Sequence, residues 1–251
     1  MTSSGTGRPV TLVTGGGRGI GAATALRLAR DGHDVALSYV HDEDAAARVA
    51  GTVRATGARC AVLRADTSRE ADVERMFDEA VERLGPLTGL VNNAGVTSPL
   101  GPLAEAQTAD LRRVLDVNVL GVLLCCRRAA RDMSAAGAGA VVNVSSAAAT
   151  LGSPGDYVHY AASKAAVDTL TLGLAKELGP AGVRVNAVAP GLIDTEIHAA
   201  SGAPDRARQG APGIPLRRPG AAEEVAAAIA WLLSDDAAYT TGTVLRVAGG
   251  R

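Results

Sequence analysis

The sequence is poor in aromatic side chains and almost free of lysine. Aromatics make up 2 % of its 251 residues, so the core must be packed from Ala, Val, Leu and Ile rather than from rings. Of the 25 basic residues, all are arginine except Lys164 and Lys176. A formal charge of −1 with no basic run provides no field that would attract nucleic acid or an anionic membrane. We therefore expect neither as a partner.

Cysteine and long apolar runs are also scarce. The three cysteines, Cys60, Cys125 and Cys126, show no CxxC or Cys/His spacing for zinc, and neighbours on a helix cannot usefully bridge each other. No bound metal is expected, and reduced thiols suit the cytosol. No apolar run reaches about 18 residues, and the first residues lack the hydrophobic region of a signal peptide. These absences predict a soluble, cytoplasmic protein.

β-branched runs alternate with stretches of helical periodicity along the whole chain. Predicted strands lie at 10–14, 35–40, 60–65, 87–95, 140–146, 183–190 and 243–247, and predicted helices at 20–30, 42–56, 69–84, 107–134, 157–178 and 221–234. Parallel strands need crossovers, so this alternation predicts an α/β fold, a parallel sheet of seven strands with helices on both faces. No linker or repeat divides it, and residues 1–251 are expected to form a single domain.

The segment 196–219 differs from the rest of the chain. It follows a predicted strand end and contains too many helix breakers for a settled helix: Gly202, Pro204, Gly210, Pro212, Gly213, Pro215 and Pro219. Ligands of such sheets bind beyond the carboxyl ends of the strands, so this segment is predicted to be a substrate lid. The plainer interpretation is a surface excursion.

A glycine-rich stretch, TGGGRGIG at 14–21, separates the first predicted strand from the first predicted helix. Gly15, Gly19 and Gly21 would let the backbone turn tightly and approach a pyrophosphate, whose charge is favoured at the amino end of a helix. A glycine-rich loop alone can be only a tight turn. Its position directly after the first strand favours a dinucleotide site.

The end of the second strand bears on which nicotinamide cofactor binds. An acidic residue there would bind the adenosine ribose and repel a 2′-phosphate, but this chain has Ser38, Tyr39 and Val40, with Asp42 only later. Arg18 lies inside the glycine loop, and a guanidinium pairs well with phosphate. The sequence therefore predicts NADP(H) in preference to NAD(H), unless Arg18 is merely a solvated loop charge.

The stretch YAASK places Tyr160 and Lys164 four residues apart in a predicted helix, so they share one face. A nearby ammonium favours the phenolate, so we expect Lys164 to lower the pKa of Tyr160 and to make it a usable general acid or base. A compact ammonium can also contact the ribose hydroxyls of a cofactor. An arbitrary pair with this spacing would more commonly be a surface pair.

Other polar residues give this pair a context. The fifth predicted strand ends in Ser145 and Ser146, where a hydroxyl could hold a substrate oxygen. Asn118 lies midway along the long predicted helix 107–134. Asparagine is a poor helix former, so its presence in a helix interior suggests a specific role. It could relay protons towards Lys164, or it could simply bend the helix.

Taken in order, these motifs resemble the short-chain dehydrogenase/reductase family, and in particular bacterial 3-oxoacyl-carrier-protein reductases and sugar or alcohol dehydrogenases such as glucose dehydrogenase. The resemblance extends from about residue 8 to the carboxyl terminus and is carried by TGGGRGIG (14–21), NNAG (92–95), Asn118, Ser146, YAASK (160–164) and PGLIDT (190–195).

The resemblance implies a Rossmann fold, a doubly wound sheet with strand order 3-2-1-4-5-6-7, and a catalytic tetrad of Asn118, Ser146, Tyr160 and Lys164. It implies that Asp66 meets the adenine and that Ile193 and Thr195 contact the nicotinamide carboxamide. The full set of expected cofactor-binding residues is Gly15, Arg18, Gly19, Ile20, Gly21, Tyr39, Asp66, Thr67, Asn92, Ala94, Gly95, Tyr160, Lys164, Pro190, Gly191, Ile193 and Thr195.

Two details depart from the family pattern. The separation of 14 residues from Ser146 to Tyr160 is one longer than is common, so one extra residue is expected within 149–159. Ser146 is preferred as the catalytic serine, with Ser145, on the opposite side of the strand, as the alternative. Thr67 stands where an apolar residue is common, and we expect little effect from it.

The predicted activity is the NADP(H)-dependent reduction of a small-molecule ketone or other carbonyl to a secondary alcohol, with Tyr160 as the general acid. The nearer alternative is an NAD-dependent alcohol or sugar dehydrogenase, and the remoter one is a dinucleotide-sensing protein without catalysis. The resemblance also implies a homotetramer in which the helices 107–134 and 157–178 pair across an interface. Their small residues, such as Ala129, Ala130, Ala161 and Ala165, would permit close packing between subunits, but packing within one chain explains them as well. A mass in solution equal to one chain would contradict the homotetramer.

Overall fold

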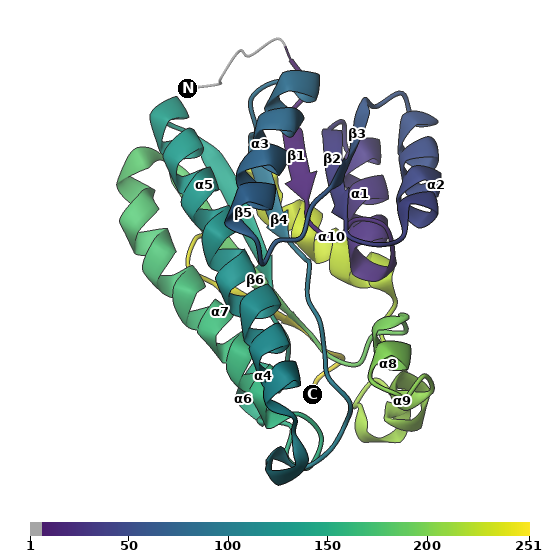
Figure 1. Cartoon of the computed structure of the whole chain (residues 1–251). Helices are drawn as coiled ribbons and strands as arrows, with labels where there is room; N and C mark the ends of the chain where they lie inside the picture. Colours follow the sequence, from purple (N-terminus) through teal and green to yellow (C-terminus); the bar gives the residue numbers. More distant parts are fainter. Residues whose placement is uncertain (1–6) are drawn as a thin grey trace.

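The seven predicted strands pair in one parallel sheet of order β3-β2-β1-β4-β5-β6-β7, which confirms the predicted topology (Figure 1). The computed structural model describes residues 7–251. The strands are β1 (Val10–Val13), β2 (Asp34–Tyr39), β3 (Cys60–Arg64), β4 (Gly89–Asn92), β5 (Gly139–Val144), β6 (Val183–Pro190) and β7 (Val244–Val247). In the register of the central strands, Leu12 lies opposite Ala36 of β2 and Leu90 of β4.

Helices cover both faces of this sheet (Figure 1). On one face lie α1 (Gly19–Arg30), α2 (Glu43–Arg54) and α10 (Ala222–Leu233), and on the other lie α3 (Glu70–Leu84), α5 (Gly121–Ala136) and α7 (Val158–Leu178). Successive strand residues point to opposite faces, so Leu12 belongs to the core under α3 and α7, whereas Val13 belongs to the core under α1 and α10. Each fully buried aliphatic side chain stabilises the fold by about 1.5–3 kcal/mol.

The long helix predicted at 107–134 is interrupted. It consists of α4 (Thr108–Leu115), a π-helical turn η2 (Asp116–Leu120) and α5, which follow one another directly. Asn118 lies in the π-helical turn and is fully buried. Single π-turns inside α-helices often mark functional sites, because they release backbone groups from the regular ladder.

Short helices occupy the carboxyl-end side of the sheet. The turn after β5 contains α6 (Ala148–Leu151), which the sequence patterns did not predict, and the segment 196–219 contains α8 (Ile197–Ala200), α9 (Arg206–Gln209) and the 3-10 turn η4 (Ala211–Gly213). The remaining 3-10 turns are η1 (Leu103–Glu105), η3 (Gly179–Ala181) and η5 (Asp235–Ala237). In Figure 1, α8 and α9 project beyond the strands, beside the end of the chain.

The exposed apolar residues bear on the predicted tetramer. Ala129 and Ala161, which were expected to permit helix pairing between subunits, are buried within this chain. The apolar side chains that α4, η2, α5 and α7 do expose are Leu115, Leu120, Leu123 and Leu172. The homotetramer stays a prediction, and these leucines are its candidate contacts. Within residues 7–251, none of the helices combines the length and apolar character required to cross a bilayer.

Candidate functional site

The glycine loop forms a bare helix amino end. Gly15 and Gly19 adopt left-handed backbone angles (φ 64° and 51°), which other L-residues adopt reluctantly. Arg18 occupies the N-cap position of α1 without a side-chain cap, and the first turn contains no acidic residue. The first amide groups of α1 therefore have no side-chain acceptor, which is the arrangement that binds phosphate.

Close packing behind the loop requires Gly21. A Cβ at this position would lie 2.4 Å from the carbonyl oxygen of Gly15 and 2.5 Å from Nδ2 of Asn93. The Asn93 amide donates to the carbonyl oxygens of Thr14 and Gly15 at 2.9 and 3.0 Å. Asn93 thus fastens the end of β4 to the glycine loop, and it also lines the cleft described next.

A cleft at the carboxyl ends of the strands joins the glycine-loop side of the sheet to the YAASK helix. It brings together nine of the predicted site residues, namely Ile20, Gly95, Ser146, Tyr160, Lys164, Pro190, Gly191, Ile193 and Thr195. Thr195 also faces the glycine loop, because a Cβ on Gly19 would lie 3.5 Å from it. Residues far apart in the sequence therefore share one cavity, as expected for a ligand that spans the sheet edge.

Tyr160 and Lys164 lie on the first turns of α7, and both are buried. The Lys164 ammonium donates to the carbonyl oxygen of Val144 at 2.8 Å and lies 5.8 Å from the centre of the Tyr160 ring. Ser146 is half-buried in the cleft lining, and its hydroxyl interacts with the phenol of Tyr160. Ser145 also borders the cleft, but its hydroxyl donates to the carbonyl oxygen of Lys164 at 3.2 Å. The structure therefore places Ser146, the preferred serine, beside the tyrosine.

The expected effect of lysine on the tyrosine requires a correction. Burial raises the pKa of Tyr160 above its ordinary value, the neighbouring Tyr157 raises it further, and only the hydrogen bond with Ser146 lowers it. Burial also lowers the pKa of Lys164 to about 8, against the influence of Asp168, which raises it. Loss of water thus outweighs the attraction that the sequence spacing implied, and Tyr160 is a neutral phenol at neutral pH.

Asn118 does not line the cleft but braces it from behind. Its Oδ1 accepts the amide of Val96 at 2.8 Å, and its Nδ2 donates to the carbonyl oxygen of Val96 at 2.9 Å and to Oγ of Ser163 at 3.1 Å. Ser163 in turn donates to the carbonyl oxygen of Tyr160 at 2.7 Å. Asn118 therefore joins the chain after β4 to the turn of α7 that bears Tyr160.

Asn92 lies in a different environment from the one expected for a cofactor-binding residue. Its amide donates to Oδ1 of Asn143 at 2.9 Å, and the Asn143 amide donates to Oγ1 of Thr171, so this buried network ties β4 to β5 and α7. The asparagine that reaches the cleft is Asn93, which lies within the range 92–95 that the resemblance assigns to the cofactor but was not named among the individual site residues. Its position directly after Asn92 was the available signal, since successive strand residues point to opposite sides.

Four further residues predicted to bind the cofactor lie at or just after the ends of β2, β3 and β4. Asp66 accepts the hydroxyl of Ser68 at 2.7 Å, Thr67 is buried against Gly121, and Ala94 donates its amide to Oγ1 of Thr14. Tyr39 is half-buried, and its pKa is raised chiefly by burial and then by Glu43. None of these residues is in the cleft lining, and their cofactor contacts stay predictions.

Tyr157 connects the cleft to the segment 196–219. Its ring lies edge-on to Tyr160 with 5.0 Å between ring centres, and the guanidinium of Arg206 lies 5.0 Å from the Tyr157 ring centre. Arg206 also pairs with Asp156 at 2.6 Å, and the carbonyl oxygen of Asp156 accepts the amide of Gly101 at 2.7 Å. Asp156, in the segment after β5, therefore contacts both the segment after β4, through Gly101, and the segment 196–219, through Arg206. Ile197 and Ser201 of the same segment line the cleft.

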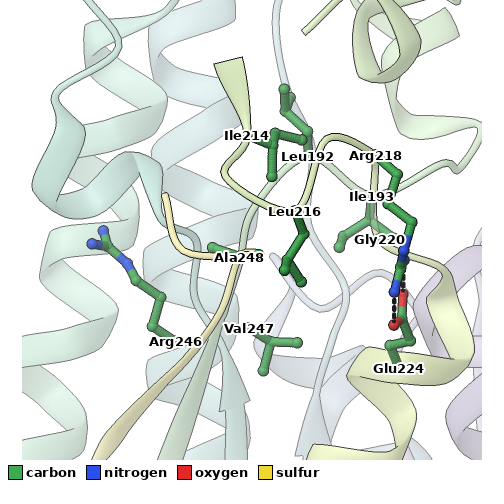
Figure 2. A pocket seen from close by; sticks show the side chains of 11 residues that line it. Leu192, Ile193, Ile214, Leu216, Arg218, Gly220, Glu224, Arg246, Val247 and Ala248 are labelled. Carbon is green, nitrogen blue, oxygen red and sulfur yellow. Dashed lines mark hydrogen bonds and ion pairs between the residues drawn. The ribbon is translucent and has the colours of Figure 1, made fainter. Parts of the chain in front are cut away.

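A second pocket lies beside the cleft and shares Leu192 and Ile193 with it (Figure 2). Ile214, Leu216, Val247 and Ala248 make its lining largely apolar, and a bidentate ion pair between Arg218 and Glu224 lies on one side. Neither Tyr160 nor Lys164 reaches it, so the reactive groups belong to the first cleft alone.

Comparisons with known proteins agree with this geometry. Residues 15–251 match a family model described as enoyl-(acyl carrier protein) reductase. The chain is 48 % identical over 245 residues to the uncharacterized oxidoreductase YgfF of Escherichia coli, covering 96 % of this chain and 99 % of that protein. It is 43 % identical over 241 residues to cis-4-hydroxycyclohexanecarboxylate dehydrogenase of Sinomonas cyclohexanicum, covering 96 % and 95 %.

Solved structures share the fold closely at lower sequence identity. A short-chain type dehydrogenase/reductase from Mycobacterium marinum superposes with a TM-score of 0.91 at 34 % identity, covering 97 % of this chain and 95 % of that one. An NAD+-bound xylitol dehydrogenase gives a TM-score of 0.89 at 32 % identity, covering 98 % and 100 %.

The chain belongs to the short-chain dehydrogenase/reductase family. It is an oxidoreductase that acts on CH–OH groups and the corresponding carbonyls, and it uses a nicotinamide dinucleotide. The left-handed glycines, the uncapped amino end of α1 and the cleft from Ile20 to Thr195 fit such a dinucleotide.

Proposed function

We propose that this protein is an NADP(H)-dependent reductase that converts a ketone to a secondary alcohol, with Tyr160 as the proton donor. One observation supports this most directly. Ser146, Tyr160 and Lys164 line the same cleft as Ile20, which belongs to the glycine loop. The expected substrates are ketones with an apolar part that can pack against the side chains of Leu192 and Ile197 in the cleft lining.

Each residue has a role that follows from its contacts. The hydroxyls of Ser146 and Tyr160 hold the carbonyl oxygen, and Tyr160 donates its proton as the oxygen gains charge. Burial keeps this phenol protonated until that moment, which suits reduction. Lys164, fixed by Val144, adds positive charge near the oxygen, and Asn118 holds the turn that bears Tyr160. The bound dinucleotide, held by the glycine loop and by Thr195, supplies the hydride.

The preference for NADP(H) is supported by the ends of α1 and β2. Arg18 is exposed, and among the described residues no hydrogen bond or ion pair engages its side chain. Two of the acidic residues that follow β2 have partners: Asp42 caps α2 through the amide of Ala45 at 2.8 Å, and Glu43 interacts with Tyr39. A guanidinium without a partner, beside a strand end without a competing carboxylate, suits a 2′-phosphate.

The test is a parallel fluorescence titration of the protein with NADPH and NADH, repeated with Arg18→Ala. We expect NADPH to bind more tightly than NADH, and the variant to weaken NADPH binding by about tenfold, because a charged contact with phosphate is lost. Arg30→Ala, at the other end of α1, is the matched control and should change neither affinity. Equal or tighter NADH binding would instead favour an NAD-dependent alcohol or sugar dehydrogenase.

We also propose that the segment 196–219 acts as a substrate lid that Arg206 holds closed. Replacing Arg206 by Met keeps the aliphatic stem but removes both the ion pair with Asp156 and the contact with the Tyr157 ring. A half-exposed ion pair and a cation–π contact together stabilise closure only modestly, so the KM for the ketone should rise by about five- to twentyfold while NADPH affinity is kept.

Arg208→Met is the control for this lid, because Arg208 lies in the same short helix but makes only an exposed contact of 3.7 Å with Asp194. Steady-state kinetics would compare the KM for the ketone in the Arg206→Met and Arg208→Met variants. A lid role is ruled out if the two variants raise KM equally, or if neither does.

A further inference from the structure

Lys164 is a buried cation with few partners. The residue is 4 % exposed, and among the described residues its ammonium donates a single hydrogen bond, to the carbonyl oxygen of Val144. An ammonium has three donors, and a charge removed from water needs compensation. Tyr160, the nearest titratable group on the cleft side, is neutral and supplies none.

Asp168 lies one helical turn beyond Lys164 on the same face of α7. Its Oδ1 is buried and has no hydrogen-bond partner, an unusual state for a carboxylate oxygen. The groups whose charge or hydrogen bonding acts on this carboxylate are Ser145, directly after β5, Lys164 on α7 and Arg246 on β7. All three favour its ionised form against the opposing effect of burial.

Ser145 connects this carboxylate to the catalytic segment. Its hydroxyl donates to the carbonyl oxygen of Lys164, and its amide donates to the carbonyl oxygen of Val188 at 2.8 Å. The next residue is Ser146, which lines the cleft. Ser145 therefore links the segment that bears Ser146 to the turn of α7 that bears Lys164, one turn before Asp168.

Arg246 closes the group from the surface side. Its guanidinium donates to the carbonyl oxygen of Ala147 at 3.2 Å and contacts Oγ1 of Thr150. Figure 2 shows this guanidinium directed away from the apolar side chains of the second pocket. Arg246 is thus an exposed cation fixed to the turn after β5, and its charge, like that of Lys164, favours the ionised form of Asp168.

We propose that Asp168 is a positioning residue of the active site, whose carboxylate supplies the counter-charge for the Lys164 ammonium and steadies the Ser145–Ser146 junction. This inference rests on the proposed function for its catalytic consequence, but not for its electrostatic one. Among the described residues, Asp168 is the carboxylate that raises the pKa of Lys164 against the effect of burial.

The sign of the effect follows from the two opposing influences. Burial lowers the pKa of Lys164 to about 8, and Asp168 raises it. Without this carboxylate the ammonium would lose its proton at a lower pH, so a larger share of the protein would carry a neutral lysine near neutrality. Asp168→Asn removes the charge and keeps the size of the side chain.

The scarcity of lysine makes a direct test possible. Protein labelled with 13C at the lysine ε-carbon contains only Lys164 and Lys176, and Lys176→Arg leaves Lys164 as the single signal. In this background we expect Asp168→Asn to lower the NMR titration midpoint of Lys164 by roughly one pH unit. Asp168→Glu should restore most of it. Glu177→Gln, which removes an exposed charge from the same helix, should leave the midpoint unchanged.

The measurement needs neither substrate nor cofactor, so failure of the proposed reductase activity would leave its result intact. In the reductase assay, the high-pH fall of kcat should move to lower pH by the same amount in Asp168→Asn. An unchanged Lys164 midpoint in a folded Asp168→Asn protein would overturn the proposal, even if its melting temperature had fallen, because a merely structural carboxylate would affect stability alone.

Discussion

Tyr160→Phe should lower kcat by a factor of about 10² to 10⁴ while leaving dinucleotide affinity nearly unchanged, because only the proton donor is removed. The phenyl ring of the variant can keep its edge-on contact with Tyr157. The substitution removes the phenol hydroxyl and, with it, the hydrogen bond to Ser146. Steady-state kinetics with a ketone, together with a fluorescence titration with NADPH, would measure the two effects separately.

Tyr157→Phe is the matched control, since Tyr157 lies three residues earlier, lines the same cleft and contacts the same ring. It should retain most of the turnover. Turnover in Tyr160→Phe comparable to that of the Tyr157 variant would remove Tyr160 from the role of proton donor and would leave the hydroxyl of Ser146 as the next candidate.

The parts of the fold that could be predicted are those that local patterns specify. Each strand is a short β-branched run, and each major helix repeats apolar residues at helical spacing, so the number of strands followed from periodicity and their order from the family resemblance. The tight turn of the glycine loop could be predicted for a similar reason. Left-handed angles at Gly15 and Gly19 belong to the glycines themselves, and need no distant partner.

The parts that could not be predicted depend on contacts between distant segments. The π-helical turn around Asn118 exists where the helix meets Val96 and Ser163, neither of which is near it in sequence. The pairing of Arg206 with Asp156 joins residues 50 positions apart, and no spacing rule finds it. Burial is likewise a property of the folded chain, which is why the predicted direction of the Tyr160 pKa was wrong.

The segment 196–219 contains short helices that the sequence pattern did not predict. Its glycines and prolines correctly predicted the absence of a long helix, but α8 and α9, of four residues each, still form within it. One helical turn gives no periodicity to recognise, and α9 is held through Ala207, which is buried, and Arg206. Tertiary contacts therefore determined local structure that the sequence pattern left undefined.

Asn118→Ala is the second substitution with a large expected effect, and its effect should fall on stability as well as on turnover. The side chain is fully buried, and its loss leaves the amide and carbonyl groups of Val96 without partners. A buried polar group left unsatisfied costs about 1–3 kcal/mol, so we expect a free energy of unfolding lower by about 3 kcal/mol or more. Thermal and urea denaturation would measure this loss.

Ser163→Ala separates the two functions of Asn118. It removes one hydrogen bond to the asparagine and one to the carbonyl oxygen of Tyr160, but it leaves both bonds to Val96 intact. We expect it to lower stability by about 1 kcal/mol, and to reduce kcat because the turn bearing Tyr160 loses its brace. If Asn118→Ala unfolds no more easily than Ser163→Ala, the two bonds to Val96 contribute little to stability. The value of the π-helical turn would then lie in holding Tyr160 rather than in holding the fold.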